Sequence, residues 1–214
     1  MKDRTGHPAL NQIIQSKETY MSDEKKDTKD SKEMFDPIGD RLIKARKVLI
    51  CEEINQTMAK RVMGQLLALA EESNDDIQLF INSQGGHVEA GDSIHDIIQF
   101  IEPRVQVIGT GWVASAGTHI FLAAAKEDRY CLPNTRFLIH QPTGGVGGQA
   151  SDIAIQAEQI LRMRERLARI ISEATGQSIE QVRKDIERDR WMTTDEAIEY
   201  GIVSKVVRSG KDLA

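Results

Sequence analysis

Three short β-branched runs, at residues 47–51, 77–81 and 105–108, limit this chain to an α/β fold. Apolar residues at helical spacing follow the first two runs, over 55–73 and 88–101. A strand, a helix and a second strand at this spacing form a right-handed crossover. We therefore expect a parallel sheet with helices outside it, with further strands at 129–132, 136–139 and 202–207.

The segment after the third run carries the clearest chemical signal. Gly109 and Gly111 interrupt the run, and residues 114–125 are rich in small and helix-forming side chains, so we predict a strand, a turn and a helix. Ser115 then lies in the first helical turn, where backbone N–H groups lack intrahelical partners and the helix dipole favours negative charge. Ser115 is therefore a candidate nucleophile beside ready oxyanion donors.

Other interpretations of this segment are open. A serine at a helix start commonly serves only as an N-cap, and the first glycine of the G-x-S-x-G nucleophile elbow is missing. The spacing of Gly109, Gly111 and Ala114 also fits a dinucleotide-binding motif, but Asp128 precedes the next strand instead of ending it. Residues 105–125 carry no formal charge, yet their three glycines and polar side chains argue against a membrane span.

Composition narrows the class of protein. The 214 residues are 40% hydrophobic and 29% charged, which is ordinary for one sizeable globular domain. A net charge of −5 and a pI of about 5.6 argue against nucleic acid as a partner. Two distant cysteines, Cys51 and Cys131, exclude a disulfide framework and a zinc knuckle. We see no secretory signal, and we expect a cytoplasmic protein without metal or cofactor.

Both ends of the predicted domain have distinctive segments. Residues 1–36 mix charges without an apolar period, so we expect a disordered or removable tail before a domain at 37–214. After the glycine-rich run at 144–148, Ser151 or Asp152 is expected to cap a long helix that ends at Gly176. The apolar band of this helix is wider than one small sheet can cover, so we expect it to pack against other subunits.

A serine nucleophile needs a base to take its proton. His119 lies one turn after Ser115 on the same helical face, and His140 follows a strand beside a proline-stiffened turn. Position alone does not choose between these two histidines. Gly85 and Gly86 follow another strand end, where paired glycines expose N–H groups to a ligand or form a plain tight turn.

Five segments in register resemble the proteolytic subunit of the Clp protease. They are Ile81–Gly86, Ala114–Gly117, Ile139–Pro142, Gly148–Asp152 and Glu187–Thr193, and the resemblance spans residues 40 to about 208. It implies a crotonase-like ββα fold, the Clp protease fold, with a protruding strand-helix handle at 143–175. It also implies two stacked seven-membered rings, a tetradecamer, joined through these handles.

The resemblance assigns roles to individual residues. It implies a Ser115, His140 and Asp189 catalytic triad, with an oxyanion hole formed by the backbone N–H groups of Gly86 and Ala116. Asp189 by itself would be taken for a surface charge. Substrate-binding residues are expected on either side of the triad, and they are Gly85, His87, Val88, Gln141, Pro142 and Thr143. The glycine-rich edge next to His140 offers backbone groups on which an extended peptide could lie as an added strand.

The resemblance also implies partners. Family members receive unfolded chains from an AAA+ unfoldase of the ClpX, ClpA or ClpC type, but residues 34–40 do not match the family's axial loop. Gln84, Trp112 and Ala116 replace the family's usual proline, glutamine and methionine. The main alternative is a structural or regulatory ring subunit that needs a paralogue for activity. An acyl-CoA enzyme of the crotonase type ranks lower, because Glu89 is the only nearby glutamate.

Overall fold

The computed structural model describes residues 36–144 and 147–213. All of the tail predicted at 1–36, apart from Asp36, lies outside the described residues. The chain divides into two compact units, Met1–Ile38 and Gly39–Ala214, and the fold described below is that of the second. Helix α2 spans Pro37–Lys44.

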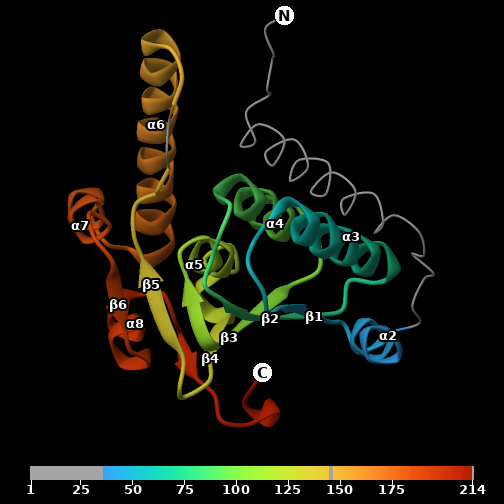
Figure 1. Cartoon of the computed structure of the whole chain (residues 1–214). Coiled ribbons are helices and arrows are strands. Elements are labelled where there is room, and N and C mark those ends of the chain that lie inside the picture. The colour runs from blue at the N-terminus through green and yellow to red at the C-terminus, as the bar shows by residue number, and fades with distance from the viewer. Residues whose placement is uncertain (1–35, 145–146, 214) are drawn as a thin grey trace, which may run out of the picture. The chain divides into compact units, whose positions relative to one another are not determined.

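One mixed sheet organises the unit, and Figure 1 shows its strands. Strands β1 (Lys47–Ile50), β2 (Ile77–Ser83), β3 (Val105–Ala114), β4 (Arg129–Cys131) and β7 (Lys205–Val206) follow one another in the order β1-β2-β3-β4-β7, all parallel. Strand β5 (Arg136–Ile139) pairs in parallel with the end of β3, and β6 (Arg190–Met192) pairs antiparallel with β5. The expected parallel sheet is confirmed.

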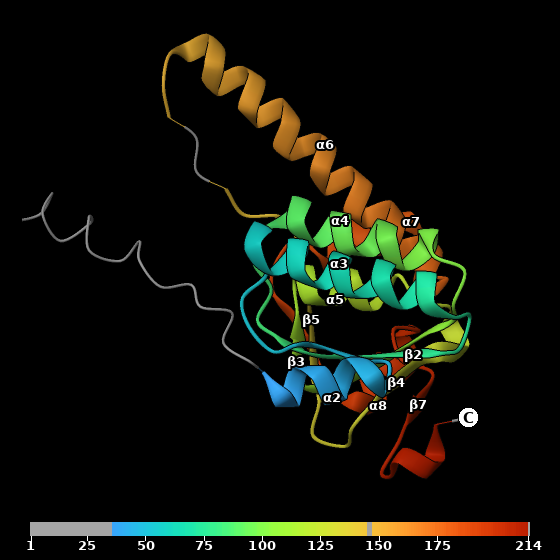
Figure 2. The ribbon, with the colours of Figure 1, turned by 90° about the vertical axis from the view of Figure 1, so that its right-hand side faces the viewer.

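Helices connect the strands and cover the sheet. They are α3 (Gln56–Glu72), α4 (Val88–Phe100), α5 (Ala116–Phe121), α6 (Ala150–Thr175), α7 (Ile179–Asp185) and α8 (Thr194–Tyr200), with short 3-10 turns at Lys126–Asp128 and Gly210–Asp212. Figure 2 shows α3, α4 and α5 stacked on one side of the sheet. The core between these layers includes the fully buried side chains of Leu66, Ile81, Ile94 and Phe121.

Helix ends match local capping chemistry. Asn55 accepts a hydrogen bond from the Met58 amide at the start of α3, and Gly176 ends α6 with φ +80°, as the sequence predicts. Helix α8 is capped by Thr193, which forms a capping box with Glu196. Helix α6 begins at Ala150 without a side-chain cap, so the predicted cap at Ser151 or Asp152 is wrong.

The largest departure from expectation is in β3. Gly109 and Gly111 do not end the strand but lie inside it, because the pairing with β2 shifts between Ile81 and Ser83 and the strand continues to Ala114. A Cβ on Gly111 (φ +61°) would meet Asn82 Oδ1 at 2.7 Å, so this bulge requires glycine. The bulged end of β3 then pairs with β5 instead of β4.

Three further elements differ from the predicted ones. The predicted helix at 114–125 is confined to α5, because the residues after Leu122 turn toward β4 and the Arg129 guanidinium binds the Ala124 carbonyl. Strand β6 is not among the predicted strands, because its pairing with β5 is a long-range contact that local sequence does not disclose. The closing strand is limited to Lys205–Val206.

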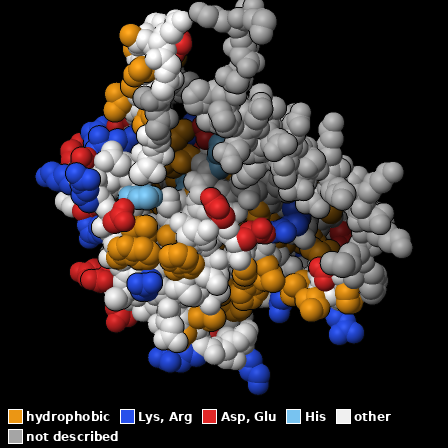
Figure 3. Space-filling view, viewed as in Figure 1, with side chains coloured by type: hydrophobic (Ala, Val, Ile, Leu, Met, Phe, Trp, Pro, Cys, Tyr) orange, Lys and Arg blue, Asp and Glu red, His pale blue; other side chains and the backbone are white. Residues whose placement is uncertain are grey.

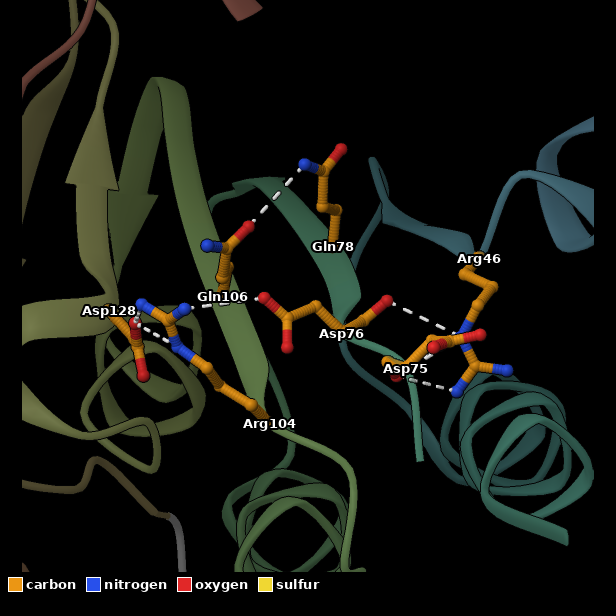
Figure 4. Close-up of polar contacts among 7 residues, drawn as sticks. All are labelled: Arg46, Asp75, Asp76, Gln78, Arg104, Gln106 and Asp128. Atoms are coloured by element: carbon orange, nitrogen blue, oxygen red, sulfur yellow. Dashed lines mark hydrogen bonds and ion pairs between the residues drawn. The ribbon is translucent and has the colours of Figure 1, made fainter. Parts of the chain in front are cut away.

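A polar network lies where the strands begin, at the amino edge of the sheet (Figure 4). Arg104, just before β3, donates to Asp128 Oδ1 at 2.8 Å and contacts Asp76 Oδ2 at 3.3 Å. Arg46, just before β1, donates to the carbonyls of Leu69, Ser73 and Asp75. This network joins segments that precede four strands.

Candidate active site

Ser115 lies at the junction of β3 and α5 with φ 55° and ψ −120°. Residues other than glycine rarely adopt these backbone angles, so the conformation is maintained only where the surrounding structure enforces it. Here the Ser115 amide donates to the Leu138 carbonyl at 3.0 Å, and the Thr118 hydroxyl lies 2.7 and 2.8 Å from the carbonyls of Val113 and Leu138. The sharp turn of a nucleophile elbow is thus present without the first glycine of its motif.

His140 follows the end of β5, directly beside that turn. Its Nε2 lies 2.8 Å from Ser115 Oγ, and its Nδ1 lies 2.9 Å from Asp189 Oδ1. Since Ser115 binds the β5 backbone through Leu138, the pairing of β3 with β5 sets the position of the serine relative to the histidine. The geometry therefore brings together the three side chains that the resemblance implies.

Asp189 belongs to the loop before β6. The Gln141 amide donates to the Ile186 carbonyl at 2.7 Å, and the Gln141 side chain donates to the Glu187 carbonyl at 3.0 Å. These bonds fix the loop against the residue that follows His140. The Asp189 side chain is 63% exposed, whereas that of His140 is 20% exposed, so the carboxylate contacts the histidine from the solvent side.

Two backbone amides lie at the same strand ends. Neither the Gly86 nor the Ala116 amide donates a hydrogen bond to another of the described residues. Gly85 (φ +97°) approaches the serine so closely that a Cβ on it would lie 2.7 Å from Ser115 Cβ. Gly86 (φ +148°) packs against Ile54, where a Cβ would overlap the carbonyl oxygen. At both positions the neighbouring chain lies too close for a side chain, so glycine is required. A plain tight turn would not explain this requirement.

A small recess, partly open to solvent, lies beside Ser115 and His140. Of the predicted substrate-binding residues, Val88 and Pro142 line it, whereas Gly85, His87, Gln141 and Thr143 do not. Its other lining residues are Ala116, Thr118, His119, Ile139, Leu167 and Ile171. Thr118 is a lining residue that was not predicted from the sequence, although its spacing of three from Ser115 placed it on the same helical face.

His119, the other candidate base, contacts α4 and not Ser115. Its Nε2 lies 2.9 Å from Asp92 Oδ1, and its ring stacks on His95 with centroids 4.5 Å apart. Asp92 also pairs with Arg166 of α6. Burial and the adjacent His119 lower the pKa of His95 to about 4, so His95 is uncharged at neutral pH. The geometry thus favours His140 as the partner of the serine.

Within residues 36–144 and 147–213, no three histidine, cysteine, aspartate or glutamate side chains gather closely enough to ligate a metal ion. No helix in these same ranges is both long and apolar enough to cross a membrane.

A serine in a strained strand-to-helix turn, hydrogen-bonded through a histidine to an aspartate, is the arrangement of α/β serine hydrolases. The geometry of the site is therefore that of a serine hydrolase. The Clp protease family model matches residues 29–210, and the chain belongs to this family. It has the Clp protease fold and is an enzyme, a serine-type endopeptidase of the Clp protease proteolytic-subunit type.

Individual relatives agree over most of the chain. An ATP-dependent Clp protease proteolytic subunit 3 of Rhizobium etli is 53% identical over 197 residues, which are 90% of this chain and 100% of that protein. A proteolytic subunit of Paracoccus denitrificans is 54% identical and covers 78% of this chain and 84% of its own length. The solved structure of ClpP1 from Listeria monocytogenes has a TM-score of 0.75 at 56% identity, over 82% of this chain and 99% of that one.

Proposed function

We propose that this chain hydrolyses peptide bonds in unfolded proteins and peptides through a Ser115, His140 and Asp189 triad. The observation that carries the proposal is the continuous contact from Ser115 Oγ to His140 Nε2 at 2.8 Å and from His140 Nδ1 to Asp189 Oδ1 at 2.9 Å. This geometry is the one in which a histidine acts as general base toward a serine.

The reaction follows from the position of each group. Ser115 Oγ attacks the carbonyl carbon of the peptide bond while His140 Nε2 takes the hydroxyl proton. The negative charge that develops on the carbonyl oxygen is stabilised by the amides of Gly86 and Ala116, which lack other acceptors among the described residues. His140 then donates the proton to the departing amine, and a water molecule hydrolyses the acyl-enzyme by the same route.

The substrate peptide is proposed to lie in an extended form beside the triad. Gln141, Pro142 and Thr143 follow β5 without regular secondary structure. The Gln141 amide is bound to the Ile186 carbonyl and Pro142 has no N–H, so the groups proposed to pair with an added strand are the carbonyls of this segment and the Thr143 amide. Gly85, His87 and Val88 bound the opposite side, and Val88 and Pro142 both line the recess. The side chain that precedes the cleaved bond would occupy this recess, since it adjoins Ser115.

Assembly is proposed from the exposed apolar side chains of α6. Figure 1 shows the first part of α6 extending away from the sheet, and Figure 3 shows hydrophobic side chains along it. Ile153, Ile155 and Leu161 are 38%, 57% and 61% exposed, and no residue of α6 before Leu167 is buried. Residues 143–175 are therefore proposed as the handle that joins two seven-membered rings into a cytoplasmic tetradecamer, because isolated proteins seldom expose such a stripe.

Domain limits and partners complete the proposal. Residues 37–214 would form the peptidase and 1–36 a removable tail, with an AAA+ unfoldase of the ClpX, ClpA or ClpC type delivering substrates. The word "ATP-dependent" in the relatives' names favours such a partner. Relatives numbered 2 and 3 also favour a second candidate, a subunit that is active only with a paralogue.

Replacement of the serine tests the proposed chemistry. Ser115→Ala should lower the kcat of peptide hydrolysis by about 10⁶-fold and abolish labelling by a fluorophosphonate probe, because no other group can form the acyl-enzyme. Ser93→Ala is a matched control, since that hydroxyl donates to the Glu89 carbonyl of its own helix and has no other partner within the described ranges. Native mass spectrometry of the same samples should show 14 subunits, the number expected from two seven-membered rings. Hydrolysis retained by pure Ser115→Ala protein would reject the proposed function, and labelling that appears only after a paralogue is added would favour the second candidate.

A further inference from the structure

The position of the Asp189 carboxylate depends on the backbone that carries it. The side chain is 63% exposed, and its contact with His140 Nδ1 is its only hydrogen bond or ion pair within the described ranges. Packing therefore gives the carboxylate little support. Gln141 donates two hydrogen bonds to the first half of the loop at 186–189, but neither bond reaches the second half, where Asp189 lies.

An ion pair joins the two ends of this loop. Asp185 ends α7 directly before the loop, and Arg190 begins β6 directly after it. Arg190 Nη1 pairs with Asp185 Oδ1, and the Arg190 backbone lies opposite Ile139, the residue before His140. Closing so short a segment at its ends reduces the conformations that it can adopt. The ion pair therefore limits the positions that the Asp189 carboxylate can reach.

Asp185 is the buried centre of this anchor. Its side chain is only 9% exposed, and it accepts hydrogen bonds at 2.9 Å from the Tyr200 hydroxyl of α8 and from the Gln181 side chain of α7. Burial and the bond to Asp185 raise the pKa of Tyr200 above its usual value, so the hydroxyl keeps the proton that it donates. The Arg190 guanidinium lies 4.7 Å from the centre of the Tyr200 ring, a cation–π contact. Helices α7 and α8 and strand β6, which meet at this anchor, lie together beyond β5 in Figure 1.

We propose that Arg190 is a positioning residue: its ion pair with Asp185 holds Asp189 in contact with the catalytic histidine. The inference rests on the proposed function, because Asp189 acts there only as a member of the triad. Neither Arg190 nor Asp185 lines the recess beside Ser115, so the ion pair is not expected to bind the substrate. Without the ion pair, the exposed carboxylate takes other positions, and a displacement of about 1 Å in a catalytic site lowers the rate by up to about 10²-fold.

A double-mutant cycle tests whether Arg190 acts through Asp189. In the full-length protein, Arg190→Gln should lower the kcat of peptide hydrolysis about 10- to 100-fold and leave KM within twofold of wild type, because the transition state loses support and substrate binding does not. In Asp189→Asn protein the same change should lower kcat less than twofold, since the carboxylate that it positions is already gone. Arg190→Lys keeps a positive charge beside Asp185 and should hold kcat within about fivefold of wild type.

A second variant weakens the anchor from α8. Tyr200→Phe keeps the aromatic ring but removes the hydroxyl that binds Asp185, so kcat should fall about threefold, and this loss should also disappear in Asp189→Asn protein. Arg183→Gln is a matched control, because this arginine of α7 pairs with Glu165 of α6 and not with the loop. Its kcat should stay within twofold of wild type.

Equal losses of kcat in both backgrounds, or an unchanged kcat in Arg190→Gln, would overturn the inference. If urea titration shows that Arg190→Gln does not fold, the Tyr200→Phe cycle decides the same question. The rate of Ser115→Ala protein gives the background and separates the two proposals. Additive losses above that background contradict only the role of Arg190, whereas hydrolysis retained by Ser115→Ala contradicts the proposed function. An undiminished kcat in Asp189→Asn would contradict both.

Discussion

The two edges of the parallel sheet are both polar, yet their polar groups are used in opposite ways. At the amino edge, Arg46 and Arg104 bind carbonyls and carboxylates of the segments that precede neighbouring strands (Figure 4). At the carboxyl edge, the amides of Gly86 and Ala116 have no acceptor among the described residues, and Ser115 has a strained backbone. The hydrogen-bonding groups of the amino edge are paired, whereas these two amides of the carboxyl edge are unpaired among the described residues.

This difference shows how one sheet can carry both stability and chemistry. Paired groups at the amino edge lower the free energy of the folded state, whereas strain and unpaired amides at the carboxyl edge raise it. Under the proposed function, activity depends on the edge that costs stability, and the rest of the fold must offset that cost. Substitutions at the carboxyl edge should change activity more than stability, and substitutions at the amino edge should do the reverse.

Asp189→Asn tests the carboxyl edge with the largest expected effect. The amide cannot hold His140 in the required tautomer or stabilise its charged form, so kcat should fall by about 10³- to 10⁴-fold. Because the Asp189 side chain is 63% exposed, urea unfolding should show little change in stability. Asp195→Asn, which alters an exposed carboxylate at the start of α8, should leave kcat within twofold of wild type.

Peptidase assays and urea titrations on both variants provide the measurement. The free energy of unfolding and the activation free energy calculated from kcat can be compared directly. If Asp189→Asn lost as much of the first as of the second, the contrast between the edges would be contradicted, since the triad would be part of the structural network. An undiminished kcat in Asp189→Asn would instead remove this residue from the proposed triad.

Arg104→Leu tests the amino edge with a smaller effect. It leaves the Asp128 carboxylate, whose side chain is 5% exposed, without its arginine, and this should lower the free energy of unfolding by about 2 kcal/mol. The value is below that of a fully buried pair because the Arg104 side chain is 42% exposed. Per folded molecule, kcat should stay within twofold of wild type.

A double variant separates the ion pair from the packing of its side chains. Arg104→Leu combined with Asp128→Leu removes both charges, so it should recover part of the stability that the single change loses. If the effects of Arg104→Leu and Asp128→Leu on the free energy of unfolding simply added in the double variant, the two residues would not act as a pair.

The sequence predicts the parts of this molecule that depend on local chemistry. Asn55 and Gly176 are recognisable as helix ends because capping involves neighbouring residues, and the strand–helix–strand spacing predicts the parallel sheet because the crossover has one preferred hand. The start of a helix at Ser115 is predicted for the same reason, although the turn predicted at Gly109 and Gly111 is absent because β3 continues to Ala114. The conformation of Ser115 is not predicted, because its strain is imposed by contacts with β5.

Contacts between distant segments account for what the residues alone do not disclose. Asp189 stands in a charged run, and only the pairing of β5 with β6 brings it to His140. Periodicity leaves His119 and His140 equivalent as bases until the fold turns one toward Asp92 and the other toward Ser115. Contacts between distant segments can be expected from a sequence only where it resembles a known family. The triad is expected here on that ground.

The smallest predicted effect concerns the strain itself. At most positions glycine is less stable than alanine by about 0.4–1 kcal/mol, because glycine has more freedom in the unfolded chain. At φ 55° and ψ −120° the order should be reversed, since glycine adopts this conformation without strain and alanine does not. Ser115→Gly should therefore be about 1 kcal/mol more stable than Ser115→Ala in urea unfolding, with both variants inactive. The same pair of substitutions at Ser93, inside α4, provides the reference for an ordinary helical position. If alanine were the more stable residue at both positions, the turn at the nucleophile would store no strain, and only the unpaired amides would distinguish the carboxyl edge.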